Sequence, residues 1–118
     1  MATTHELTGE QIAFAIENRE FGDDVLLSNR CVAVVLSQSW CPQWMMVSRW
    51  LDKLPDEADI DIYISVYDRK DYYQEFMHFK ETVFDNREVP YIRYYRDGKL
   101  FKETNYTSKD FFLKSFGM

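Results

Sequence analysis

One uninterrupted apolar segment constrains the fold of this chain more than any other. All six residues of Cys31–Leu36 are apolar, and three of them are valine. Such a run predicts a strand that is buried on both faces, as in the parallel sheets of α/β proteins. A polar segment follows and leads to Trp40-Cys41-Pro42, where a helix is expected to begin, because proline fits the first helical position. We therefore expect a sheet that is covered by helices on both faces.

The composition predicts one folded domain. The chain has 118 residues, of which 46% are apolar and 17% aromatic, which excludes a disordered chain. The 14 basic and 20 acidic side chains give a formal net charge of −6. An acidic domain repels phosphate backbones, so no nucleic-acid partner is expected. No apolar run is long enough to span a membrane, and none resembles the core of a signal peptide.

Two cysteines do not make a disulfide framework, so the reducing cytoplasm is the expected location. The oligomeric state is left open.

The two histidines have no cysteine or carboxylate at ligand spacing, and no phosphate-binding glycine loop is present, so neither a metal nor a cofactor is expected.

The remaining elements follow from periodicity and capping signals. The expected order is helix, strand, helix, strand, helix, strand, strand, helix. The first helix begins at Thr8, where Thr8–Gln11 fits a capping box. The Asp-Gly pair within Arg96–Lys99 predicts a hairpin. The other predicted elements are a helix from Pro42 to about Leu54, a strand over Ile60–Val66, a helix over Asp68–Phe84, strands over Tyr91–Tyr95 and Leu100–Glu103, and a helix after Ser108.

Cys41 is the residue whose position most clearly indicates chemical reactivity. It lies where a buried strand ends and a helix begins, and ligands bind at this edge of open α/β sheets. The positive end of the helix dipole and its unpaired N–H groups favour a thiolate there. Pro90 is the second informative position. A proline entering a buried strand removes a hydrogen-bond donor, and a cis Val89–Pro90 bond would account for it.

These motifs together resemble those of the thioredoxin family. Trp40-Cys41 matches the family's active-site Trp-Cys, Val89-Pro90 matches its cis-proline, and Arg96–Lys99 matches its hairpin. The resemblance implies an α/β fold, a three-layer α/β/α sandwich with a small mixed sheet and a cis-proline at Pro90. Residues 25–118 would form this thioredoxin-like domain. Residues 1–24 would add an extra N-terminal helical extension packed on it, because no strand is evident ahead of Thr8.

The resemblance also implies the site residues. Cys41 would be the catalytic residue, and the residues in contact with a bound partner would be Trp40, Pro42, Trp44, Val89 and Pro90. The chain departs from the family where the second cysteine of Cys-x-x-Cys would resolve a mixed disulfide, because that position is Trp44. Cys31 cannot replace it, since it lies at the opposite end of an extended strand, well beyond the roughly 7 Å between bridged Cα atoms.

Two functions remain open from the sequence. In the first, the protein takes part in thiol–disulfide redox chemistry as a monothiol through Cys41, with protein thiols or disulfides, or glutathione, as partners. No glutathione-binding signature is evident beyond Pro90 and its backbone edge. In the second, it is a non-catalytic binding module that holds a partner protein in the groove beside Pro90. Whether the protein is an enzyme stays open, and dithiol thioredoxin activity is not expected.

Overall fold

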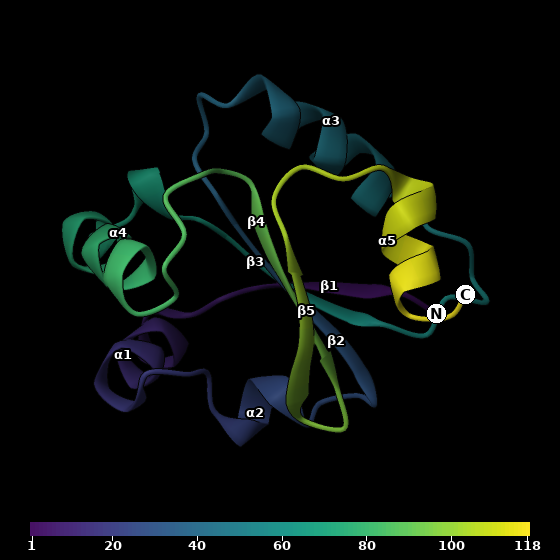
Figure 1. Ribbon diagram of the computed structural model, residues 1–118, viewed down its shortest axis with the longest axis horizontal. Helices are drawn as coiled ribbons and strands as arrows, with labels where there is room; N and C mark the ends of the chain where they lie inside the picture. The colour runs from purple at the N-terminus through teal and green to yellow at the C-terminus, as the bar shows by residue number, and fades with distance from the viewer.

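The structure, a computed structural model that describes residues 1–118, is an α/β sandwich built on a five-stranded mixed sheet (Figure 1). This confirms the expected fold class. In chain order the elements are β1 (Thr3–Glu6), α1 (Gly9–Asn18), α2 (Asp23–Leu26), β2 (Cys31–Ser37), α3 (Pro42–Leu51), β3 (Asp61–Val66), the 3-10 helix η1 (Tyr67–Arg69), α4 (Tyr73–Thr82), β4 (Tyr91–Arg96), β5 (Lys99–Thr104) and α5 (Lys109–Ser115).

The apolar strand β2 lies at the centre of the sheet, whose strand order is β1-β3-β2-β4-β5. It pairs in parallel with β3 on one side and antiparallel with β4 on the other. Every residue of β2 is buried, as the unbroken apolar run predicts. The carboxyl ends of β2 and β3 therefore meet at the same edge of the sheet, where the chain turns towards α3 and η1.

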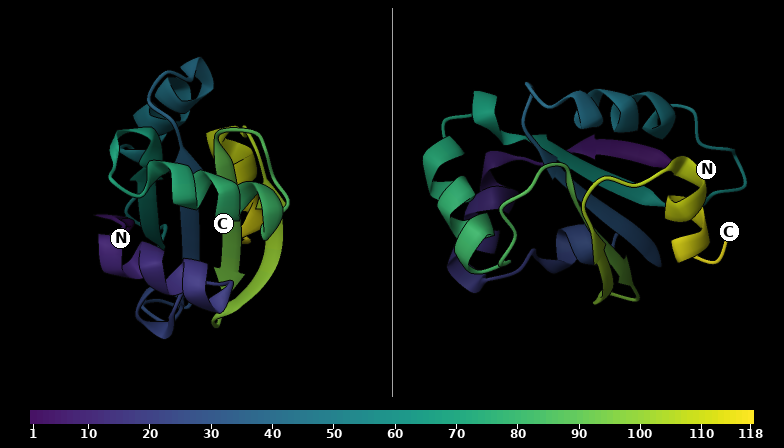
Figure 2. Two further views of the ribbon diagram at one scale, coloured as in Figure 1. Left: turned by 90° about the vertical axis from the view of Figure 1, so that its left-hand side faces the viewer. Right: turned by 45° about the horizontal axis from the view of Figure 1, so that its top comes forward.

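Helices cover both faces of the sheet (Figure 2). One face carries the larger apolar core, to which α1, α2 and α4 contribute, and the other carries a smaller core with α3 and α5. Alternate residues of β2 serve the two layers: Val32 and Val34 belong to the larger core, and Ala33 and Val35 to the smaller one. This alternation follows from the two-residue period of a strand.

Several local signals fold as predicted. Thr8 caps α1 in a reciprocal capping box, in which its side chain accepts from the Gln11 backbone and the Gln11 side chain accepts from the Thr8 backbone. The β4–β5 hairpin turns at Asp97 and Gly98, both with positive φ. At Gly98 a Cβ atom would lie only 2.6 Å from the Leu27 side chain, so both the backbone conformation and the space favour glycine.

The N-terminal segment differs from the prediction. Thr3–Glu6 forms a strand, β1, that pairs in parallel with β3 at the edge of the sheet. Its side chains are largely exposed and mostly polar, so no apolar alternation marks it. Backbone hydrogen bonds hold it instead, including those from Thr3 to Ile60 and from Leu7 to Ile64. Residues 1–24 therefore supply a sheet strand as well as helix.

The helix expected over Asp68–Phe84 is also shorter and divided. The chain first forms η1 and then α4, which begins at Tyr73. Within η1 the Asp68 carboxylate accepts two hydrogen bonds from Ser39 on a neighbouring loop, a tertiary contact that helical periodicity does not reveal. Likewise α3 ends at Leu51 rather than near Leu54.

Candidate functional site

Cys41 is the residue immediately before α3. It has extended backbone angles as the N-cap, and Pro42 occupies the first turn. The Cys41 amide donates to the carbonyl of Gln38, and its carbonyl accepts from the Met45 amide. The backbone of the residue is therefore fixed from both sides. Its side chain makes no capping hydrogen bond to the helix, so the sulfur is free to point elsewhere.

The sulfur points at the loop that precedes β4. Cys41 Sγ lies 3.5 Å from the carbonyl oxygen of Val89 and donates to it. The Val89–Pro90 peptide bond is cis. Cys41 is only 4% exposed, so the thiol is more enclosed than its position at a helix start suggests. Residues 48 positions apart in the sequence thus face each other at the edge of the sheet.

The loop between β2 and Cys41 is anchored by Asp68, at the carboxyl end of β3. The Asp68 carboxylate accepts from the Ser39 amide at 2.8 Å and from the Ser39 hydroxyl at 2.7 Å. Burial raises the pKa of Asp68, but the two hydrogen bonds from Ser39, together with its own backbone N–H and the charge of Arg69, bring that pKa below its usual value. Asp68 is therefore a charged anchor for the loop at neutral pH.

Gln38 provides a second anchor. Its side-chain oxygen accepts from the indole Nε1 of Trp40 at 2.6 Å, and its nitrogen donates to the hydroxyl of Tyr67 at 3.2 Å. Burial raises the pKa of Tyr67, so its hydroxyl stays protonated. Trp40 is 62% exposed, yet its indole is held in one orientation by this contact. An apolar ring is thereby presented to solvent next to Cys41.

A pocket of about 400 Å³ opens beside the thiol. Four of the six sequence-predicted site residues line it: Trp40, Cys41, Pro42 and Val89. The others do not. Trp44 is half-buried and packs against the smaller core, and Pro90 is buried, with its carbonyl accepting from Asn105. The remaining lining residues are Gln38, Gln43, Arg87 and Glu88.

Sequence reasoning did not single out Gln38, Ser39, Tyr67 or Asp68 as parts of the site. One signal points to them, because all four follow directly on the carboxyl end of β2 or β3, where ligand sites of α/β sheets gather. Their polar character alone does not separate them from ordinary loop residues.

Cys31 takes no part in this site. It begins β2, where its register partner is Arg96 next to the hairpin, whereas Cys41 lies beyond the other end of the strand. Both cysteines are free and buried. The site therefore has one thiol.

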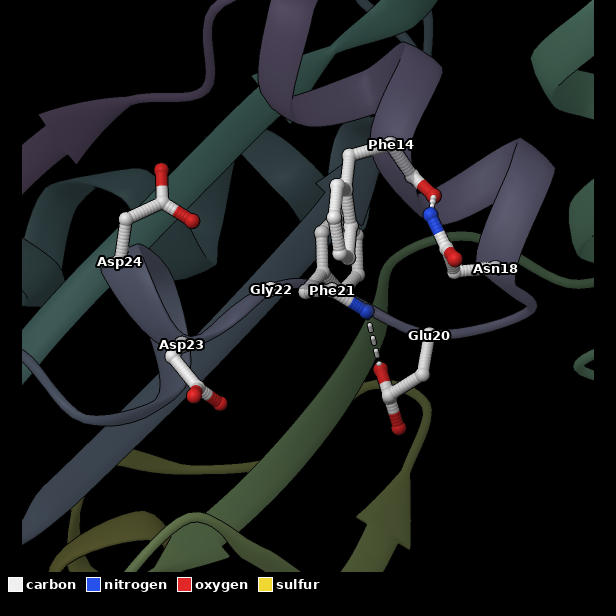
Figure 3. A pocket seen from close by; sticks show the side chains of 7 residues that line it. All are labelled: Phe14, Asn18, Glu20, Phe21, Gly22, Asp23 and Asp24. Carbon is white, nitrogen blue, oxygen red and sulfur yellow. Dashed lines mark hydrogen bonds between the residues drawn. The ribbon is translucent and has the colours of Figure 1, made fainter.

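A larger hollow of about 480 Å³ lies elsewhere, between α1 and α2 (Figure 3). Three of its lining side chains are carboxylates: Glu20, Asp23 and Asp24. Glu20 is already engaged, because it accepts from the Phe21 amide, from Tyr95 and from Arg93. No three metal-binding side chains of the protein are placed to hold an ion together. No thiol, hydroxyl or imidazole side chain lines this hollow.

Comparison by sequence finds no relative: no family model matches the chain, and no curated protein matches it. None of the helices has the length and apolar character needed to cross a bilayer.

Solved thioredoxin structures, by contrast, superpose over nearly the whole chain. A mutant thioredoxin from Halobacterium salinarum NRC-1 gives a TM-score of 0.64 at 19% identity, covering 97% of this chain and 86% of the other. Thioredoxin O1 from Arabidopsis thaliana in the oxidized state gives 0.64 at 14%, covering 98% and 93%. Trxlp from Edwardsiella tarda EIB202 gives 0.63 at 16%, covering 97% of each chain. The chain therefore has the thioredoxin fold, as the sequence motifs predict.

Proposed function

We propose that this protein carries out thiol–disulfide exchange through one sulfur, that of Cys41. The observation that carries the proposal is the position of this thiol at the start of α3, beside a pocket and opposite Val89. The helix N-terminus stabilises negative charge on such a sulfur. The thioredoxin fold and the exposed Trp40 next to the pocket add further support.

The exchange proceeds in two balanced steps. The Cys41 thiolate attacks one sulfur of a partner disulfide, a Cys41–partner disulfide forms, and the other partner sulfur leaves as a thiolate. No second cysteine is within reach to resolve this mixed disulfide. The thiolate of an external thiol, such as glutathione, then attacks the partner's sulfur and releases Cys41 as a thiolate. A cytoplasmic location would supply that thiol.

The enclosure of Cys41 sets a condition on the first step. Only the protonated sulfur can donate to the Val89 carbonyl, so attack requires the sulfur to ionise and turn from Val89 towards the pocket. An incoming extended segment could pair with the backbone at Val89, which would place its disulfide next to Cys41. Partner binding and thiol exposure are thus coupled in this proposal.

The burial of Cys41 also favours a second candidate function. A thiol that is 4% exposed and lacks a resolving partner suits a site that is kept for its shape. In this case the protein is a binding module that holds a partner protein beside Val89 and Pro90, with Trp40 as the exposed apolar contact. Cys41→Ser would then leave partner binding unchanged.

Intact mass measurement after incubation with oxidised glutathione tests the first function. We expect one glutathione per chain on the native protein and on Cys31→Ser, and none on Cys41→Ser. Reduced glutathione should then remove the adduct. We expect no insulin reduction above buffer in the dithiothreitol-coupled assay. A native protein that stays unmodified, while Cys41→Ser still binds partners captured from the cell, would favour the binding module.

A further inference from the structure

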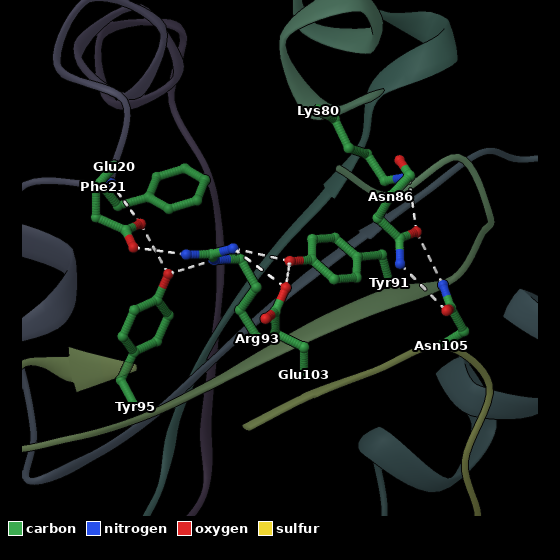
Figure 4. Close-up of polar contacts among 9 residues, drawn as sticks. All are labelled: Glu20, Phe21, Lys80, Asn86, Tyr91, Arg93, Tyr95, Glu103 and Asn105. Atoms are coloured by element: carbon green, nitrogen blue, oxygen red, sulfur yellow. Dashed lines mark hydrogen bonds and ion pairs between the residues drawn. The ribbon is translucent and has the colours of Figure 1, made fainter. Parts of the chain in front are cut away.

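A buried lysine contacts the loop between α4 and β4, whose residue Val89 faces Cys41. Figure 4 shows this lysine, Lys80, beside Asn86. The Lys80 side chain, on α4, is fully buried. Its ammonium donates to the carbonyl oxygens of Asn86 and Glu88, each at 2.8 Å, and to the Asn86 side-chain oxygen at 3.3 Å. A lysine ammonium has three hydrogens, and all three are used. Every acceptor belongs to the loop between α4 and β4.

The hydrogen-bond partners of the Lys80 ammonium are unusual for a buried cation. Buried ammonium groups are costly unless they are paired, and the common partner is a carboxylate. No carboxylate accepts from Lys80, although Glu81 and Glu88 are near enough to favour its charged form. The third group that faces it is the Tyr91 ring on β4, 5.3 Å from Nζ. The hydrogen bonds of this cation therefore go to loop residues alone, two of them to the backbone.

The loop held in this way carries the acceptor of the Cys41 thiol. Glu88 is followed directly by Val89, whose carbonyl accepts from Cys41 Sγ. Asn105 holds the loop from the opposite side. Its side-chain Nδ2 donates to the Pro90 carbonyl at 3.1 Å, and its side chain pairs with that of Asn86 (Figure 4). Lys80 and Asn105 thus fix the chain immediately before and after the Val89–Pro90 bond.

We propose that Lys80 is a positioning residue for the Cys41 site, where its ammonium holds the 86–88 backbone so that the Val89 carbonyl stays opposite the thiol. The effect of Lys80 on thiol–disulfide exchange rests on the proposed function. Its positioning of the Val89 carbonyl does not depend on that function. Loss of the Lys80 contacts releases the loop, frees the sulfur from Val89 and makes Cys41 more accessible to a small electrophile.

The geometry also makes the hydrogen bonds between Lys80 and the loop sensitive to pH. Burial lowers the pKa of Lys80 to about 8, against the opposing influence of Glu81 and Glu88. A neutral amine has two hydrogens for three acceptors, so deprotonation removes one of the three contacts. The loop is therefore held most firmly below this pH.

The first test measures the alkylation rate of Cys41 with iodoacetamide at pH 7, resolved by peptide so that Cys31 is counted separately. Lys80→Met, which keeps an unbranched chain without the charge, should raise the rate about fivefold, the equivalent of one ordinary hydrogen bond. Lys114→Met removes an exposed lysine and should leave it unchanged. Phe112→Leu destabilises the other core and should also leave it unchanged, which separates loop release from general loss of stability.

The second test requires no change at Lys80. In Cys41→Ser, which lacks the thiol that contacts Val89, the backbone amide resonances of Glu88 and Val89 are followed by NMR from pH 6 to 10. We expect both to shift with a midpoint near 8, together with the side-chain resonance of Lys80. Amides that do not move, or an alkylation rate in folded Lys80→Met equal to that of the native protein, would overturn the proposal. Amides that follow Lys80 in a protein that forms no mixed disulfide would instead refute only the proposed function.

Discussion

Cys41 Sγ and the Val89 carbonyl oxygen face each other at 3.5 Å, and this contact joins the start of α3 to the loop before β4. The contact fixes the orientation of the sulfur. Cys41 and its neighbours Trp40 and Pro42 line the pocket beside it. The chemistry proposed for the protein begins when this contact is broken.

Replacing Trp44 by cysteine should supply the missing resolving thiol. Residue 44 lies one helical turn beyond Cys41 on α3, so a cysteine there restores the Cys-x-x-Cys spacing. We expect Trp44→Cys to reduce insulin in the dithiothreitol-coupled assay, and the native protein not to do so. Trp44→Ser, which loses the same packing without adding a thiol, should stay inactive. Equal activity in the two variants would show that the thiol spacing is not the missing element.

Replacing Asp68 by asparagine should weaken the loop before Cys41 in a pH-dependent way. The pKa of Asp68 is lower in the folded protein than its ordinary value of 3.8, so its stabilising effect is complete above that value. The effect is lost as pH falls through the folded pKa. Urea unfolding should thus find Asp68→Asn less stable than the native protein at pH 7 and equally stable in strong acid. A difference that persists unchanged in acid would contradict this account.

The buried ammonium of Lys80 should leave a signature in alkaline stability. Its pKa is about 8 in the folded protein and 10.5 as its ordinary value, so the unfolded chain binds more protons between these pH values. Stability from this group therefore rises with pH across that window, by at most about 1.4 kcal/mol per pH unit.

The measurement is the free energy of unfolding of the native protein minus that of Lys80→Met, from pH 7 to 10. The subtraction removes the contribution of the buried tyrosines Tyr91 and Tyr95. Burial raises their pKa values, so they lower the stability as the pH rises above 10. A difference that is flat across the window would mean that Lys80 titrates as an exposed lysine does.

Arg93 should be the most costly charged residue to remove. Its buried guanidinium donates to Glu20 at 2.7 Å and to the hydroxyls of Tyr91 and Tyr95 (Figure 4). It also lies over the Phe84 ring. Breaking such a buried pair costs about 3–5 kcal/mol. Urea unfolding of Arg93→Ala should show this loss. Arg30→Ala removes an exposed pair with Asp97 and should cost less than about 1 kcal/mol. Similar losses in both variants would refute the burial argument.

The sequence predicts the central part of this fold because strong local signals agree there. The apolar run of β2, the alternation in β3 and the Asp97-Gly98 turn each specify one element on their own. The position of Cys41 at the start of α3 follows from the proline after it. Strand β1 is different, because its exposed polar side chains carry no pattern and its backbone pairing with β3 decides its structure.

The site is only partly predictable for a related reason. The sequence places Cys41 and Val89 at the same edge of the sheet, but the enclosure of the thiol depends on how the loop before β4 is folded. That loop is held by Lys80 on α4 and by Asn105, just after β5, through contacts that no local motif signals. The direction of Trp44, into the smaller core rather than the pocket, depends on how α3 is rotated against the sheet.

Reaction of the folded protein with an aromatic disulfide, with release of the coloured thiolate followed by absorbance, tests the central claim most directly. If Cys41 is the exchanging sulfur, native protein and Cys31→Ser each release one thiolate per chain under native conditions, and Cys41→Ser releases none. Release that is the same with and without Cys41, or that occurs only after unfolding, would contradict the account.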